Sequence, residues 1–133
     1  MKKYLLDTNI CIFYFKGKYD LDQHLNRVGF ENCCISEITF AELLYGAECS
    51  NNKEKNVQMI HDFAKAITIV PIFNALNVYA QEKFLLRKAG QMIDDFDLLI
   101  GATAIANDMV LVTDNEKHLA RLSNLKVENW IAR

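Results

Sequence analysis

The sequence predicts an α/β fold in which a parallel β-sheet is flanked by helices on both faces. Short apolar segments typical of strands alternate with longer amphipathic segments typical of helices along the whole chain. No proline-rich or glycine-rich linker breaks this alternation, and 133 residues suffice for one compact domain. We therefore expect a single domain over residues 1–133, with the strand-to-helix loops at one edge of the sheet.

Five segments are predicted as strands because they are short, apolar and bounded by polar or turn-forming residues. Segment 3–6 ends abruptly in a carboxylate, a hydroxyl and an amide, and segment 33–35 is followed by a serine suited to cap a helix. Segment 68–72 is rich in β-branched residues and holds the only proline, which the end of a strand tolerates. Segment 109–112 is apolar throughout, and segment 126–128 can add a last strand at the edge of the sheet.

The intervening segments are predicted as helices from their apolar periodicity and from the residues that bound them. Glycine closes three of them, at Gly17, Gly29 and Gly90, and Asp94 or Asp95 caps a fourth. The expected helices cover residues 9–16, 21–28, 37–48, 51–66, 75–88, 95–107 and 115–122.

The composition is that of an ordinary globular protein, with 51% hydrophobic and 24% charged residues. The net charge of −2 comes from 15 basic and 17 acidic residues, so a bulk basic surface for nucleic acid is absent. No apolar run approaches the roughly 18 residues that span a bilayer, and we expect a cytoplasmic protein. The four cysteines and three histidines form no zinc-binding motif, and we expect the cysteines to be buried, reduced thiols.

Four acidic residues fall where an α/β fold gathers its functional groups, at the carboxyl ends of strands and at the starts of helices. Asp7 follows the first strand, Asp114 follows the fourth, and Asp97 lies in the first turn of a helix. Glu42 lies on an apolar face of the helix 37–48, where an unpaired charge is costly. Each also has a structural interpretation: a helix cap, a loop residue, a favourable interaction with a helix dipole and a buried salt bridge, respectively.

Carboxylates packed together repel one another, and a hard divalent cation such as Mg²⁺ or Mn²⁺ removes that penalty. Such an ion activates water and stabilises the leaving oxygen of a phosphodiester. We therefore predict metal-binding and catalytic roles for Asp7, Glu42, Asp97 and Asp114. Further candidates are Thr8, Asn9 and Thr113, as hydrogen-bonding support, and Glu116, as an alternative to Asp114.

The motifs around these acids resemble those of PIN-domain ribonucleases, and more closely the VapC-type toxins of prokaryotic toxin–antitoxin pairs. The chain departs from the family pattern shortly before the third acid, where the family often has glycine or proline and this chain has Ile93, Asp94, Asp95 and Phe96. Asp94 is therefore a further alternative acid. The matching motifs cover residues 6–10, 39–43, 97–102, 111–115 and 127–130.

This resemblance implies a Rossmann-like PIN domain with five parallel strands. It implies that Asp7, Glu42, Asp97 and a fourth acid, Asp114 or Glu116, bind Mg²⁺ or Mn²⁺. It also implies an endoribonuclease that cleaves structured RNA such as tRNA or rRNA and leaves a 5′-phosphate and a 3′-hydroxyl. A VapB-like antitoxin and a homodimer are the implied partners.

Two other classes of protein share part of this pattern. A haloacid-dehalogenase-like phosphatase would use Asp7 as its nucleophile, but that family has a second aspartate two residues later, where this chain has Asn9. A housekeeping PIN-domain nuclease, or an inactive PIN-domain module that only binds RNA, would share the fold. An inactive relative is expected to lack one of the acids, and all four are present here.

One further segment, residues 13–19, interleaves aromatic and cationic side chains. Aromatic rings can stack on bases and lysines can contact phosphates, so this segment is a candidate RNA-binding surface. Its structural interpretation is a helix that covers the core.

Overall fold

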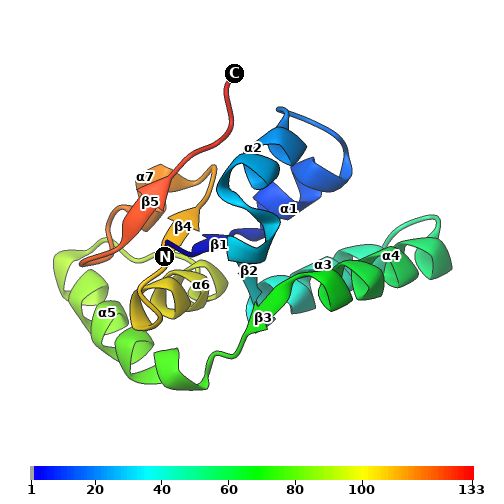
Figure 1. Ribbon diagram of the computed structural model, residues 1–133. Helices are drawn as coiled ribbons and strands as arrows, with labels where there is room; N and C mark the ends of the chain where they lie inside the picture. The colour runs from blue at the N-terminus through cyan, green and yellow to red at the C-terminus, as the bar shows by residue number, and fades with distance from the viewer. Residues whose placement is uncertain (1) are drawn as a thin grey trace.

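The computed structural model describes residues 2–133 and confirms the predicted α/β architecture with five parallel strands (Figure 1). The strands are β1 (Tyr4–Leu6), β2 (Cys33–Ser36), β3 (Thr68–Val70), β4 (Val110–Val112) and β5 (Lys126–Glu128). They form one sheet in the order β3-β2-β1-β4-β5. The central strand is β1, whose Leu5 lies opposite Cys34 of β2 and Leu111 of β4. Residues that follow β1 and β4 are therefore neighbours in space.

Helices cover both faces of this sheet, because successive side chains of a strand point to opposite faces. Leu6 packs in one apolar cluster with residues of the first four helices, and Leu5 packs in a second cluster with residues of the last three. Helices α3 and α4 run side by side as a long hairpin in Figure 1. The helices are α1 (Thr8–Phe15), α2 (Leu21–Val28), α3 (Glu37–Glu48), α4 (Lys53–Ala66), α5 (Leu76–Ala89), α6 (Asp95–Ala106) and α7 (Glu116–Leu119), with 3₁₀ turns η1 (Phe30–Asn32) and η2 (Phe73–Ala75).

Local capping explains why most predicted boundaries hold within one or two residues. Ser36 Oγ accepts the Thr39 N–H at 3.1 Å and starts α3, and Gly90 ends α5 with a φ of +69°. The segment predicted to be helical over 115–122 is an exception, since α7 ends at Leu119 and single turns follow. Within residues 2–133, no helix is long and apolar enough to cross a membrane.

Gly101 of α6 allows a close contact with neighbouring side chains. A Cβ at this position would lie 2.8 Å from Leu122 Cδ2 and 3.2 Å from Leu119 Cδ1, so the close neighbours are α7 and the turn after it. This packing fixes the end of α7 and the turn after it beside α6.

The four cysteines are unpaired, as predicted, but they differ in burial. Cys11, Cys33 and Cys34 are buried in the two apolar clusters. The expectation is wrong for Cys49, which is exposed because it is the C-cap of α3, where the chain turns toward α4.

Candidate active site

The four predicted acids line one pocket of about 270 Å³. Two of them follow the adjacent strands β1 and β4, and the other two come from helices α3 and α6. The full lining consists of Asp7, Thr8, Asn9, Glu42, Asp97, Asp114 and Asn115. The structure thus gathers residues that are up to 108 positions apart in the sequence onto one surface depression.

Asp7 is the most buried of these acids, with 6% of its surface exposed. Its Oδ1 accepts the Thr8 N–H at 2.8 Å, and its Oδ2 accepts the Thr113 hydroxyl at 2.7 Å. Burial raises the pKa of this carboxyl above its ordinary value, and the two hydrogen bonds act against that rise. Asp7 is therefore both the N-cap of α1 and a pocket-lining carboxylate, so its structural and functional interpretations are compatible.

Glu42 is held at the pocket by Thr8, whose hydroxyl donates to Glu42 Oε1 at 2.6 Å. The expectation that the face of α3 carrying Glu42 is buried is wrong. Helix α3 buries the adjacent face, with Leu43 and Ala47, whereas Tyr45, which shares the face of Glu42, is 71% exposed. The reason is that α3 packs against α4 and α1 along the face of Leu43, which leaves Glu42 at the edge of the pocket.

Asp97 lies in the first turn of α6, where Asp94 is the N-cap and accepts the main-chain N–H of the residue two positions on at 3.1 Å. The cap is thus supplied by another residue, and Asp97 faces the pocket beside Asn115, whose Nδ2 lies 3.5 Å from Asp97 Oδ2. Burial, followed by the negative charges of Asp7, Asp94 and Glu42, raises the pKa of Asp97 to about 6. Asp94 lines only the neighbouring hollow, which it shares with Asp97.

Asp114 lines the pocket and is held by an arginine fork. Arg133 Nη1 donates to its Oδ1 at 2.8 Å and Nη2 donates to its Oδ2 at 2.7 Å. This guanidinium holds the pKa of Asp114 below its usual range. Glu116 lies outside the pocket lining, and its Oε1 accepts the Asn129 amide at 3.3 Å. The structure thus places Asp114, and not Glu116, on the pocket.

The three supporting residues predicted from the sequence take different places. Thr8 and Thr113 contact carboxylates, as described above, and Asn9 lines the pocket. Two further residues at the site, Asn115 and Arg133, are absent from the sequence-based prediction. The sequence around Asn115 indicates only a helix cap, and nothing local in the sequence connects Arg133 with Asp114.

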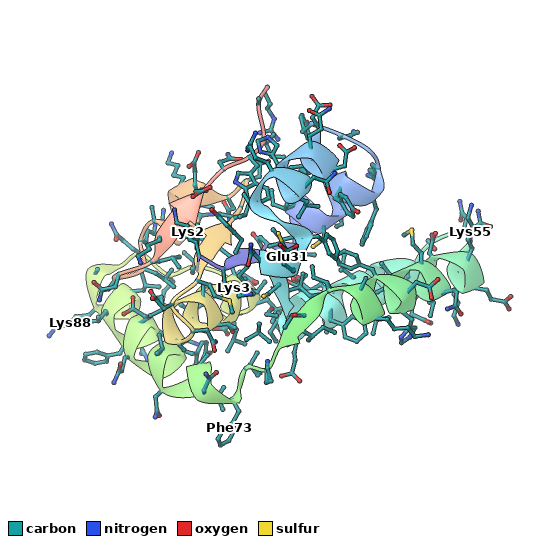
Figure 2. All side chains as sticks on the ribbon, in the orientation of Figure 1. Lys2, Lys3, Glu31, Lys55, Phe73 and Lys88 are labelled. Carbon is teal, nitrogen blue, oxygen red and sulfur yellow. The ribbon has the colours of Figure 1, made fainter. Side chains whose placement is uncertain are left out.

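The segment of residues 13–19 takes the structural role. Phe13, Tyr14 and Phe15 pack against the apolar cluster beneath α1. Lysines that could supply a local basic surface are also dispersed: Lys55 lies at the far end of the α3–α4 hairpin, and Lys88 lies at the opposite side of the molecule on α5 (Figure 2). Lys16 and Lys55 nevertheless line a second hollow that also includes Glu42, so two lysines lie next to the acidic pocket on the side of Glu42.

The charge of the pocket fits a divalent cation. In the part of the chain that the structure describes, no lysine, arginine or histidine forms a salt bridge with Asp7, Glu42 or Asp97. This removes the buried salt bridge as an explanation of Glu42. Carboxylate and amide oxygens are the donors that Mg²⁺ and Mn²⁺ prefer. The donors are not preassembled, since among residues 2–133 no three acidic, histidine or cysteine side chains are grouped closely enough to hold an ion.

Comparison with known proteins agrees with the geometry. A family model described as the PIN domain matches residues 4–125. The protein named "Ribonuclease VapC2" of Haemophilus influenzae is 36% identical over 134 residues, which cover 98% of this chain and 100% of that relative. The chain belongs to the VapC ribonucleases of the PIN-domain family. Another VapC protein, the "tRNA(fMet)-specific endonuclease VapC" of Shigella flexneri, is 33% identical over 98% of this chain and 99% of its own length.

Solved VapC structures share the whole fold. The DNA-bound VapBC of Salmonella typhimurium superposes with a TM-score of 0.90 at 30% identity, over 98% of this chain and 99% of that chain. VapBC2 of Rickettsia felis, bound to a promoter DNA fragment, gives a TM-score of 0.89 at 35% identity, over 96% and 98%. The resemblance drawn from the VapC-like motifs is therefore confirmed, and the haloacid-dehalogenase alternative is not favoured.

Proposed function

We propose that the chain is a metal-dependent endoribonuclease and the toxin of a toxin–antitoxin pair, which hydrolyses phosphodiester bonds of structured RNA such as tRNA or rRNA. The observation that carries this proposal is that Asp7, Glu42, Asp97 and Asp114 line one pocket and that, among the residues described, the first three have no paired cation. The name of the Shigella flexneri relative, a tRNA(fMet)-specific endonuclease, supports tRNA as the first substrate to test.

The need for a divalent ion follows from the charge of the pocket. RNA brings further negative charge to a site that already holds four carboxylates, so the bare pocket repels its substrate. Asp7, Glu42 and Asp97, with Asp114 as the fourth acid, would hold Mg²⁺ or Mn²⁺, and the bound ion would supply a Lewis acid to activate water and stabilise the leaving oxygen. We therefore expect strict dependence on a divalent ion.

The residues of the chain orient the carboxylates for this role. The Thr8 N–H and the Thr113 hydroxyl fix the two oxygens of Asp7. The Thr8 hydroxyl fixes one oxygen of Glu42, which leaves the other free. Removing a group that orients a metal ligand in this way typically lowers metal affinity or activity by about 10- to 100-fold. Asn9, exposed at the pocket edge, is placed to contact RNA.

A VapB-like antitoxin is the proposed partner, because the similar solved structures of VapC proteins include VapBC complexes. We further propose that the chain forms a homodimer and acts in the cytoplasm, where tRNA and rRNA occur. Co-expression with the product of a small neighbouring reading frame should abolish toxicity, and the two proteins should co-purify.

The test of the proposed activity is cleavage of purified tRNA and rRNA by the purified protein. We expect cleavage with Mg²⁺ or Mn²⁺, no cleavage in EDTA, and products with a 5′-phosphate and a 3′-hydroxyl. Asp97→Asn, purified in the same way, controls for contaminating nuclease and should be inactive. Cleavage that continues undiminished in EDTA would contradict the proposal.

A further inference from the structure

We propose that Arg133 is a substrate-binding residue, whose guanidinium, oriented by Asp114, binds a phosphate group of the RNA beside the acidic pocket. This inference rests on the proposed cleavage of RNA and adds to it a specific residue that contacts the substrate.

The first argument is the geometry of the ion pair. Both carboxylate oxygens of Asp114 accept hydrogen bonds from the guanidinium of Arg133, at 2.8 and 2.7 Å. A guanidinium has five N–H donors, and this fork uses two. Three donors therefore remain for another ligand. A bidentate arginine of this kind is suited to planar recognition of carboxylate and phosphate oxygens.

The second argument is where the two charges lie. The side chain of Asp114 is 17% exposed, whereas that of Arg133 is 59% exposed. The carboxylate therefore faces the pocket while the cation lies outside it, accessible to a ligand in solvent. RNA bound at the pocket can therefore contact the guanidinium from solvent.

The third argument is that the arginine is preorganised. Its guanidinium carbon lies 5.7 Å from the centre of the Tyr19 ring, and that ring packs edge-on against Phe13 at 5.1 Å. Contact with an aromatic face and a carboxylate restricts the rotamers of the arginine before any ligand arrives. Less side-chain entropy is then lost on binding, which favours affinity.

The backbone that carries Arg133 is fixed as well. After β5 the chain runs beside α2 (Figure 1). Trp130 is 6% exposed, its ring stacks on His24 at 5.3 Å, and it lies 5.5 Å from the ring of Tyr4. The Ile131 N–H donates to Asn129 Oδ1 at 2.9 Å. The segment from β5 to Arg133 is thus anchored in the core three residues before the arginine.

The fourth argument is that the site needs a cation for its substrate. Across residues 2–133, the Arg133–Asp114 pair is the only salt bridge that involves an acid of the pocket. The exposed lysines Lys55 and Lys88 lie at opposite ends of the molecule (Figure 2). Lys16 and Lys55 line an adjoining hollow that includes Glu42, so they approach the pocket from the side of Glu42, whereas Arg133 is placed to meet an RNA phosphate beside Asp114.

The experiment measures binding of fluorescently labelled tRNA by fluorescence polarisation in Mg²⁺, over a range of salt concentrations. Asp97→Asn is the common background, so that the RNA is not cleaved. Adding Arg133→Gln should weaken binding roughly tenfold and lower the slope of log affinity against log salt by about one. Arg133→Lys should restore the slope and only part of the affinity, because it keeps the charge but not the fork. Lys88→Gln, which removes an equal charge far from the pocket, should change neither.

The outcomes separate this inference from the proposed function. If wild type neither cleaves nor binds tRNA or rRNA in Mg²⁺, both the proposed function and this inference fail. If the background binds RNA and Arg133→Gln leaves affinity and slope unchanged, the inference about Arg133 is wrong while the proposed function stands. Mn²⁺ binding is measured in parallel for wild type and for Arg133→Gln without the Asp97 substitution. Tighter Mn²⁺ binding by Arg133→Gln, with unchanged RNA affinity, would mean that Arg133 restricts the metal rather than binding the substrate. Circular dichroism melts confirm that each variant is folded.

Discussion

The hydroxyl of Thr113 donates a 2.7 Å hydrogen bond to Asp7 Oδ2 and thereby joins residues 106 positions apart in the sequence. Both follow strands that are neighbours in the sheet, and the Asp7 N–H donates to the Val112 carbonyl at 2.9 Å. The hydroxyl oxygen of Thr113 also accepts the Asn115 N–H at 2.9 Å. Parallel pairing of β1 with β4 is therefore what orients the buried carboxylate of the site.

This relationship predicts the effect of Thr113→Val. The variant keeps the shape of the side chain but removes a donor from a buried carboxylate, so we expect a loss of about 1–3 kcal/mol in the free energy of unfolding. Cleavage should fall by roughly 10- to 100-fold. Urea denaturation and an RNA cleavage assay measure the two effects. Thr113→Ser retains the hydroxyl and should remain close to wild type, and a fully stable, active Thr113→Val would show that the bond is unimportant.

The raised pKa of Asp97 predicts how stability varies with pH in the absence of metal. The pKa rises from the ordinary 3.8 to about 6 on folding, so between these pH values the folded state binds more protons than the unfolded state. The contribution of Asp97 to the free energy of unfolding is therefore greatest below pH 4, and it falls as the pH rises to about 6. Chemical denaturation in EDTA should show wild type losing stability relative to Asp97→Asn across this range. A difference that does not vary with pH would contradict the assignment.

The same titration predicts that the affinity for Mn²⁺ rises with pH, because the ion competes with the proton for the Asp97 carboxylate. Below pH 6 the affinity should fall by up to about tenfold per pH unit, and above about pH 7 the contribution of Asp97 should level off. Isothermal titration calorimetry at several pH values measures this. An affinity that is constant from pH 5 to 7 would exclude Asp97 as a ligand.

The choice of the fourth acid gives a prediction about Asp114 and Glu116. Asp114 lines the pocket, and Glu116 does not. Asp114→Asn should therefore reduce cleavage by tens- to thousands-fold, through its own role and through weaker positioning of Arg133. Glu116→Gln should retain most of the activity. If Glu116→Gln is the more damaging change in the same assay, the assignment of Asp114 is wrong.

The sequence predicts most of the fold because the signals that define it are local. Strands end where polar residues begin, as at Asp7, and helices begin at side-chain caps such as Ser36 and Asp94. The gathering of Asp7 and Asp114 follows from parallel topology, since both come directly after strands or one residue beyond them. Part of the site can therefore be predicted from the order of strands and helices alone.

The features that the sequence does not predict depend on long-range packing. Which face of α3 is buried depends on where α4 and α1 pack, so the environment of Glu42 is not encoded in its periodicity. The pairing of Arg133 with Asp114 depends on the path taken after β5, which Trp130 fixes against Tyr4 and His24. No short motif carries that information.

The central claim is that Asp7, Glu42 and Asp97 form a metal site rather than a structural charge network, and Asp97→Asn tests it. In EDTA this change removes a like charge, and each such pair costs on the order of one to a few kcal/mol at intermediate dielectric. Losing a favourable interaction with the start of α6 offsets about 0.3–1 kcal/mol of that gain. The variant should therefore be at least as stable as wild type without metal, although it is inactive.

Thermal melts of wild type and Asp97→Asn, each in EDTA and in Mn²⁺, measure this most directly. In EDTA, we expect Asp97→Asn to melt at the same temperature as wild type or higher. Mn²⁺ at one hundred times its dissociation constant should stabilise wild type by about 2.7 kcal/mol and the variant by much less. A variant that melts several degrees below wild type in EDTA, and that responds to Mn²⁺ as wild type does, would show that Asp97 is structural and that the active site lies elsewhere.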